Sequence, residues 1–177
     1  MAAAWESVVV RLVDDRGPAL RRYAWLLCGN EDDAADLVQD ALVKTFGRFG
    51  NGFTVAGAEA YVRRTILTLF LDRSRRRVLW RRQAHLQVAP DTSPSPDPGT
   101  GARIDLWNSL RVLAPRERAC LVLRYYEDLK IDDIAVELGI SPGAVKRYVS
   151  DGLAKMAIVV GESPVSPVQG APHAHRS

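Results

Sequence analysis

The sequence predicts an all-α protein made of two small helical domains joined by a flexible linker. Apolar residues recur at spacings of three and four in both halves of the chain, which is the repeat of amphipathic helices. Between Ala89 and Gly101, four prolines and two glycines stand where large apolar side chains would be needed for packing, a composition typical of a linker. The 177 residues are 47% hydrophobic and 25% charged, so the chain has the overall balance of a folded globular protein.

The linker divides the chain into segments with different roles. We expect a first domain over residues 1–88, the linker over 89–101, a second domain over 102–160 and a disordered tail over 161–177. No apolar run approaches the roughly 18 residues that indicate a membrane span, and the amino terminus has neither a basic start nor a long apolar core. We therefore expect no membrane insertion and a cytoplasmic location.

The first domain predicts two amphipathic helices with a loop between them. Residues 32–49 have acids in the first turn and one apolar stripe, formed by Val38, Ala41, Leu42, Phe46 and Phe49. Residues 47–60 contain four glycines and predict a shaped loop. Residues 61–77 predict a second helix, whose apolar stripe is Val62, Ile66, Leu69 and Phe70 and whose polar side carries Tyr61, Arg64, Thr65, Thr68 and Asp72.

The second domain ends in a predicted helix-turn-helix. Helices are expected over 103–114 and again from Pro115, which suits the first turn of a helix. A helix over about 132–138 then stops at Gly139, and Ser141 caps a further helix that starts at Pro142. The inner faces of this pair are expected to be Ile134, Ala135, Leu138, Ile140, Val145, Val149 and Leu153.

Charge is distributed unevenly along the chain, although the net charge is only +3. Residues 31–40 hold five acids and no base, whereas residues 61–85 hold eight arginines and one acid. These patterns also arise from helix-dipole complementarity and from a solvated helix face. Together they suggest that one face meets nucleic acid and another meets a basic protein. Phe53, Tyr61 and Trp80 lie near the arginines, where they could stack on unpaired bases or pack in the core.

The second helix of the helix-turn-helix is a candidate for the major groove of DNA. Its amino-terminal side chains would face base edges, and these are Ser141, Gly143, Ala144, Lys146, Arg147 and Ser150. A helical hairpin with solvated cations would show the same pattern. Residues 141–155 sum to a charge of only +2, so this unit alone is expected to bind with modest affinity.

The sequence contains no motif that indicates an enzyme or a metal site. The chain has no phosphate-cradling glycine loop, no HExxH and no GxSxG. Cys28 and Cys120 lack neighbours at metal-ligand spacing, and a disulfide between them is not expected. The only paired histidines, His173 and His175, would form an adventitious metal site at most. We expect no enzymatic activity, no cofactor and no metal.

Three segments, in order, resemble regions 2 and 4 of the extracytoplasmic-function group of bacterial sigma-70 family factors. They read DDAADLVQDALVKTFGRF, AYVRRTILTLFLDRSRRR and LAPRERACLVLRYYEDLKIDDIAVELGISPGAVKRYVSDGLAKM, and the resemblance covers about residues 18–157. It implies that the acidic helix docks on the β′ clamp helices of core RNA polymerase and that the second domain approaches the β flap. An anti-sigma factor wedged between the two domains is a further partner that the resemblance suggests.

The resemblance also implies a set of site residues. Those expected to bind polymerase are Asp36, Leu37, Gln39 and Asp40. Those expected to open and read the minus-10 promoter element, with the loop from about Gly50 to Gly57, are Phe53, Tyr61, Arg63, Arg64, Thr68, Arg73, Arg75, Arg76 and Arg77. The helix-turn-helix residues named above would read the minus-35 element.

Two departures from the family pattern affect these expectations. Thr68 stands where the family often has Asn, so the base preference there is expected to differ. Asp151 and Gly152 stand where basic residues commonly continue the recognition helix. Two other classes of function remain: a helix-turn-helix regulator that binds duplex DNA without polymerase, and a regulator that mimics a sigma factor to bind an anti-sigma protein. The acidic helix and the Gly-rich loop favour the sigma-factor hypothesis, because a protein that binds only duplex DNA needs neither.

Overall fold

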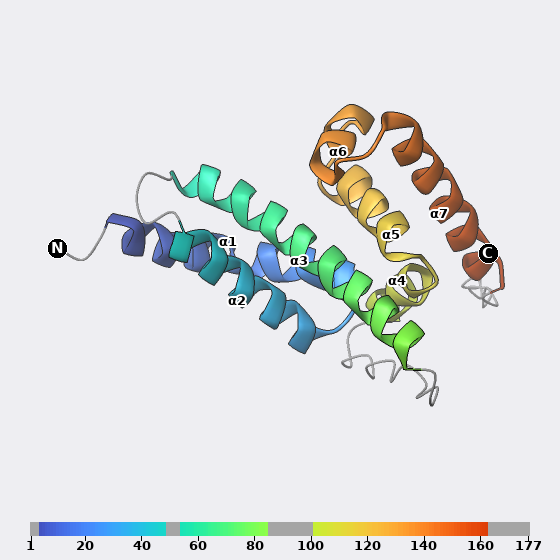
Figure 1. Cartoon of the computed structure of the whole chain (residues 1–177), viewed down its shortest axis with the longest axis horizontal. Coiled ribbons are helices and arrows are strands. Elements are labelled where there is room, and N and C mark those ends of the chain that lie inside the picture. Colours follow the sequence, from blue (N-terminus) through green and yellow to red (C-terminus); the bar gives the residue numbers. More distant parts are fainter. Residues whose placement is uncertain (1–3, 49–53, 85–100, 163–177) are drawn as a thin grey trace, which may run out of the picture.

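The computed structural model describes residues 4–48, 54–84 and 101–162, and this part of the chain is helical without strands. Figure 1 shows the first three helices side by side and the remaining helices gathered at the carboxy-terminal end of α3. The predicted all-α class is confirmed. The elements are α1 (Ala4–Cys28), α2 (Glu31–Arg48), α3 (Val55–Gln83), α4 (Gly101–Arg111), α5 (Pro115–Leu121), the π-helical turn η1 (Val122–Tyr126), α6 (Ile131–Leu138) and α7 (Pro142–Glu162).

Helices α1, α2 and α3 pack together around one apolar core. Leu20 and Leu27 of α1, Leu37 of α2 and Ile66 of α3 are at most 1% exposed. The apolar stripe predicted for α3 is confirmed, since Val62, Ile66, Leu69 and Phe70 are all buried. Burial of these stripes is what stabilises helices of this kind, because helical propensity alone is weak.

The predicted loop over 47–60 is wrong over most of its length. Residues 47–48 end α2, and α3 already begins at Val55. The reason is a helix cap: Thr54 is extended, and its hydroxyl oxygen accepts the N–H of Gly57 at 3.2 Å. Only residues 49–53 of the predicted loop, which include Phe53, lie outside the described residues. Because α3 continues to Gln83, all eight arginines of the cationic stretch lie on one helix.

The helix-turn-helix is formed as predicted by α6 and α7. Gly139 ends α6 in the left-handed conformation with φ of 63°. The hydroxyl oxygen of Ser141 accepts the N–H of Ala144 at 3.1 Å, which caps α7. Ile134 and Val145 are fully buried between the two helices.

One predicted inner residue of α7 is misplaced. Leu153 is 42% exposed, whereas its neighbour Gly152 is buried against α5. A Cβ at Gly152 would lie 2.9 Å from Cδ1 of Leu121, so the glycine permits this close approach of α5 and α7. The departure at Gly152 therefore has a packing reason, whereas Asp151 is exposed.

The two domains touch each other in this structure. Trp107 of α4 lies against Gly29, and the two indole rings of Trp25 and Trp107 have centroids 6.0 Å apart. Nη1 of Arg118 donates to the carbonyl oxygen of Leu27 at 2.8 Å. None of the described helices is long and apolar enough to span a bilayer.

Candidate functional site

The first candidate surface is the acidic face of α2. Asp36, Gln39 and Asp40 are exposed, at the spacing that places residues on one side of a helix. Leu37 is only 1% exposed and packs in the core, so it lies beneath this face, and its contact with polymerase stays a prediction. The sequence reasoning missed Val43, which is 66% exposed one turn after Gln39 and Asp40 and adds an apolar side chain to this face.

The second candidate surface is the outer side of α3. Tyr61, Arg64 and Thr68 are exposed, as predicted from the helical repeat. The hydroxyl of Thr68 donates to the carbonyl oxygen of Arg64 at 3.0 Å, and the hydroxyl of Thr65 donates to that of Tyr61 at 2.9 Å. The Thr68 hydroxyl is thus turned toward its own helix, while its oxygen can still accept a hydrogen bond.

Arg63 differs from the other arginines of α3 because its side chain is only 17% exposed. Its guanidinium pairs with Glu59 at 3.0 Å and also with Glu127 of the second domain. It lies over the ring of Tyr23, 5.4 Å from the ring centroid. Burial raises the pKa of the Glu127 carboxyl, an effect that the charge of Arg63 opposes.

A second ion pair joins the same surfaces. Nε of Arg64 lies 3.9 Å from a carboxylate oxygen of Glu137 in α6. Two acids of the second domain therefore face the amino-terminal half of α3: Glu127, which directly follows η1, and Glu137 of α6, beside which Arg64 stays 60% exposed. Sequence reasoning missed Glu127 and Glu137, because nothing in their local pattern indicates a partner more than 60 residues away.

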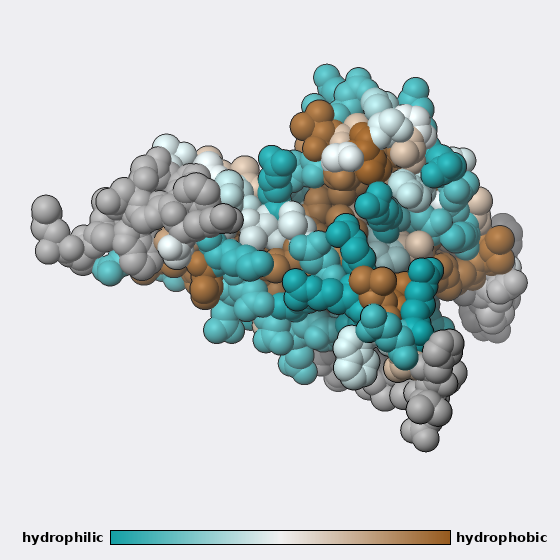
Figure 2. Space-filling view, viewed as in Figure 1, coloured by the Kyte–Doolittle hydropathy of each residue, from teal (hydrophilic) through white to brown (hydrophobic). Residues whose placement is uncertain are grey.

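The carboxy-terminal half of α3 is open. Arg75, Arg76 and Arg77 are exposed, and Arg75 lies 3.8 Å from Asp72 on the same helix. Arg73 is half-buried and pairs at 2.5 Å with Asp40, so it joins the arginine and acidic faces. Figure 2 shows that hydrophilic residues cover most of this part of the visible surface.

The third candidate surface is the start of α7. Gly143, Lys146, Arg147 and Ser150 are exposed together, whereas Ala144 is half-buried. The hydroxyl of Ser141 is already used to cap the helix. Lys155 is not part of this surface, because its Nζ donates to both carboxylate oxygens of Glu117, at 2.7 and 2.8 Å.

The joint between the domains centres on Arg118 and Trp107. Arg118 donates to three backbone carbonyls, those of Leu27, Leu110 and Leu113, and it lies 4.9 Å from the centroid of the Trp107 ring. Burial lowers the pKa of Arg118 to about 10, and the side chain remains charged at neutral pH. Neither the joint nor the role of Arg118 was predicted.

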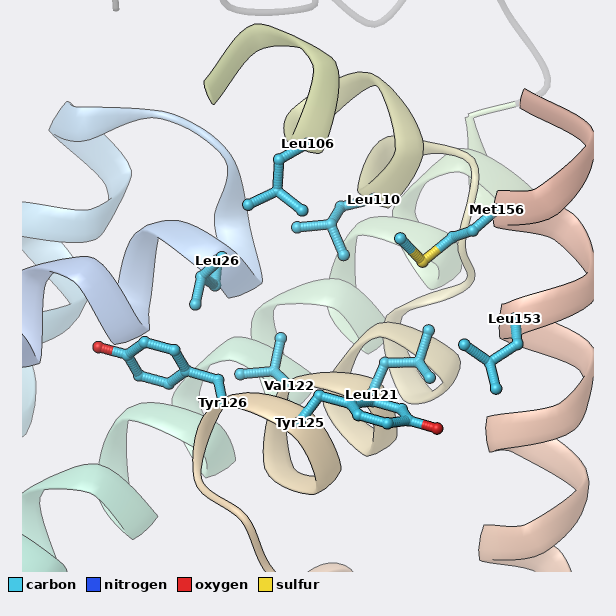
Figure 3. A pocket seen from close by; sticks show the side chains of 9 residues that line it. All are labelled: Leu26, Leu106, Leu110, Leu121, Val122, Tyr125, Tyr126, Leu153 and Met156. Carbon is cyan, nitrogen blue, oxygen red and sulfur yellow. The ribbon is translucent and has the colours of Figure 1, made fainter. Parts of the chain in front are cut away.

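An apolar pocket of about 410 Å³ lies beside this joint (Figure 3). Leu26 comes from the first domain, and the other lining residues come from α4, α5, η1 and α7. In Figure 3, Leu106 and Leu110 of α4 face Leu26 across the pocket, and Leu153 and Met156 of α7 close the far side. The exposed side chain of Leu153 therefore lines this pocket.

Both domains match known families. Residues 12–79 match sigma-70 region 2, and residues 103–156 match sigma-70 region 4. An RNA polymerase sigma-E factor of Streptomyces avermitilis is 35% identical over 147 residues, covering 81% of this chain and 80% of the relative. The ECF RNA polymerase sigma factor SigL of Mycobacterium tuberculosis is 28% identical over 174 residues, covering 93% and 96%. Among solved structures, the sigma factor RpoE of Bartonella quintana, crystallised with the anti-sigma factor NepR, has a similar fold, with a TM-score of 0.62, 21% identity, and 89% and 96% coverage.

Proposed function

This chain belongs to the extracytoplasmic-function group of the sigma-70 family of bacterial RNA polymerase sigma factors. We propose that it binds core polymerase through α2, the minus-10 element through α3 and the minus-35 element through α7. As a sigma factor it binds core polymerase and directs initiation at promoters. One observation supports this division most strongly: a single chain exposes an acidic face and two separate cationic faces. A regulator that binds only duplex DNA needs only one of them. We place its action in the cytoplasm, with the polymerase, and assign it a regulatory role without catalysis.

The acidic face of α2 is the proposed docking surface for core polymerase. Asp36 and Asp40 supply charge, and exposed Val43 supplies an apolar contact beside them. Charge complementarity of this kind sets the rate and specificity of association, while the apolar contact adds affinity. Leu37 supports this surface from the core beneath it.

The outer side of α3 is the proposed minus-10 surface, and its use requires the two domains to separate. Arg63 cannot contact promoter phosphates while its guanidinium is enclosed by Glu59 and Glu127, and Arg64, although 60% exposed, lies beside Glu137. The arrangement described above is therefore a closed form of the free chain. Polymerase, by holding the two domains at separate sites, would free Arg63 and Arg64 from these carboxylates, while the start of α7, which is already exposed, would read the minus-35 element.

An anti-sigma factor is a further proposed partner. The structural neighbour from Bartonella quintana was crystallised with such a protein. In this chain the apolar pocket is lined from both domains, so a protein that filled it would favour the closed form.

Transcription with purified components tests the proposal. The chain is added to bacterial core polymerase on fragments of genomic DNA, and transcript 5′ ends are mapped. We expect a limited set of start sites that share upstream minus-10 and minus-35 elements. Binding to duplex DNA without any specific transcript would instead indicate a polymerase-independent regulator.

A pair of charge reversals tests the docking surface in the same system. Asp36→Arg should weaken binding to core polymerase, whereas Asp14→Arg, on the exposed side of α1, should not. Both changes lie on the helix surface, where substitutions usually alter the free energy of unfolding by less than about 0.5 kcal/mol. Equal binding by the Asp36 variant and the parent would show that docking uses another surface.

A further inference from the structure

The last turns of α3 expose three apolar side chains in a row, those of Val78, Leu79 and Trp80. Single exposed apolar residues are common, but three in succession add nothing to the core and indicate a contact with another molecule. Trp80 lies just beyond the match to sigma-70 region 2, which ends at residue 79. Its role therefore has to be inferred from its surroundings in this chain.

Trp80 is placed differently from the other two tryptophans whose side chains the structure describes. Trp25 and Trp107 are buried, and their rings lie near each other at the joint between the domains. Trp80 is 76% exposed. The sequence left two roles open for it, packing in the core and stacking on a base, and this exposure excludes the first.

Two exposed arginines lie on the same side of α3 as Trp80. Arg76 and Arg77 precede it by four and three residues, which places them one helical turn before it. Arg73, a further turn back, pairs with Asp40 at 2.5 Å, so its charge is already balanced. An exposed ring beside two exposed guanidinium groups suits a partner that carries both negative charge and flat apolar groups. Nucleic acid has both.

The directions of the three apolar side chains favour nucleic acid over a membrane surface. Successive residues of an α-helix are rotated by about 100°, so Val78, Leu79 and Trp80 point to three different sides. Val78 lines a cavity between α3 and the α4–α5 junction, away from Trp80. A helix that binds a membrane surface instead gathers its apolar side chains on one face. One ring next to two cations is, by contrast, sufficient to hold one nucleotide.

We propose that Trp80 stacks on an unpaired base of the promoter, while Arg76 and Arg77 bind the neighbouring phosphates. Aromatic rings that stack on bases, combined with cations that follow the backbone, are the general means by which proteins hold single strands. The proposal rests on the proposed minus-10 role of α3 and extends it. Trp80 lies twelve residues after Thr68, about 18 Å farther along the helix, so it contacts a different nucleotide.

This end of α3 is exposed in the free chain, so the stacking site can be tested without polymerase. A chain that starts specific transcripts can still lack the site, and a chain that binds single strands through Trp80 can still fail to start transcripts. Failure of the stacking site is therefore distinguishable from failure of the proposed sigma-factor function.

The test measures binding of the full chain to a short mixed-sequence DNA oligonucleotide by fluorescence anisotropy, at several salt concentrations. The same sequence as a duplex and vesicles of phosphatidylglycerol are the comparison probes. Trp80→Phe keeps an aromatic ring, whereas Trp80→Leu keeps only apolar area. Arg76→Gln removes one charge beside Trp80, and its matched control, Arg82→Gln, removes one from nearly the opposite side of the same helix. Thermal unfolding confirms that each variant is folded.

We expect Trp80→Leu to bind the single strand about five- to a hundredfold more weakly, and Trp80→Phe to keep most of the affinity. The slope of log affinity against log salt should stay unchanged in Trp80→Leu, because stacking releases no counterions. Arg76→Gln should reduce that slope by about 0.7, and Arg82→Gln should reduce it less. Saturable quenching of tryptophan fluorescence by the single strand should disappear in Trp80→Phe.

Three results would overturn the proposal. The first is equal affinity of Trp80→Leu and the parent for the single strand. The second is binding of the duplex as tight as that of the single strand, with the same dependence on Trp80. The third is binding to the vesicles, but not to DNA, that depends on Trp80, which would identify a membrane surface as the partner.

Discussion

Gly29 is the residue on which the closed arrangement depends most directly. It joins α1 to α2 with φ of 88°, a conformation that costs other residues about 1–2 kcal/mol. A Cβ at this position would lie 1.9 Å from two atoms of the Trp107 ring, so Gly29→Ala must also displace that side chain. Loss of a buried tryptophan costs about 3–5 kcal/mol, which sets the upper end of the second contribution. We expect Gly29→Ala to lower the free energy of unfolding by about 2–5 kcal/mol.

Urea unfolding followed by circular dichroism measures this loss. Gly47→Ala is the control, because a Cβ there meets no atom within 4 Å, and it should stabilise α2 by up to about 1 kcal/mol. In a Trp107→Ala background the clash is absent, so Gly29→Ala should then cost only the backbone contribution. A loss below about 1 kcal/mol in the parent, or the same loss in both backgrounds, would refute this reasoning.

Three further predictions concern the binding surfaces and the ion pairs. Thr68→Asn should change the base preference at one minus-10 position in promoter-variant transcription more than it changes overall affinity; a uniform loss would indicate a packing role. Arg147→Ala should relax specificity at one minus-35 position, by about 1–3 kcal/mol if it pairs with guanine, whereas Lys146→Ala should weaken all sequences alike and reduce the salt slope by about one. Burial raises the pKa of the Glu59 carboxyl, but hydrogen bonds from Arg16 and Arg63 lower it overall. The pKa of the Glu117 carboxyl is also raised by burial and lowered overall by hydrogen bonds, which come from Lys155 and the Ala114 amide. Both carboxyls therefore stabilise the fold above their ordinary pKa of 4.5, and urea titrations should show that this stability is lost as the pH falls below it; a flat profile would contradict the assignment.

The sequence was sufficient to predict the helices and their buried stripes, because both follow from local spacing. Val62, Ile66 and Phe70 repeat within two turns, and Gly139 and Ser141 mark the helix-turn-helix by chemistry that acts within a few residues. The predicted loop over 47–60 was wrong because its glycine content favours a loop, whereas the cap that Thr54 supplies starts a helix at Val55.

The arrangement of the two domains could not be predicted from local patterns. Gly29 and Trp107 are separated by the whole of α2 and α3 along the chain, and neither has a neighbour that indicates the contact. The same holds for Arg63, which belongs to a cationic run by sequence but is enclosed by Glu59 and Glu127 in space. Burial of Leu37 was missed for a different reason, since a family motif does not say which of its side chains face the core.

In the free chain Arg63 of α3 is paired with the second domain, and we expect this contact to open when the chain binds polymerase. Spin labels at Ala60→Cys and Val136→Cys, both exposed and next to the Arg64–Glu137 contact, report the separation of the two surfaces. The native thiols of Cys28 and Cys120 should react poorly, because burial raises the pKa of each to about 11. We predict a short distance between the labels in the free chain and a long one in the active complex with core polymerase. The same short distance in an active complex, or a long distance in the free chain, would contradict the account.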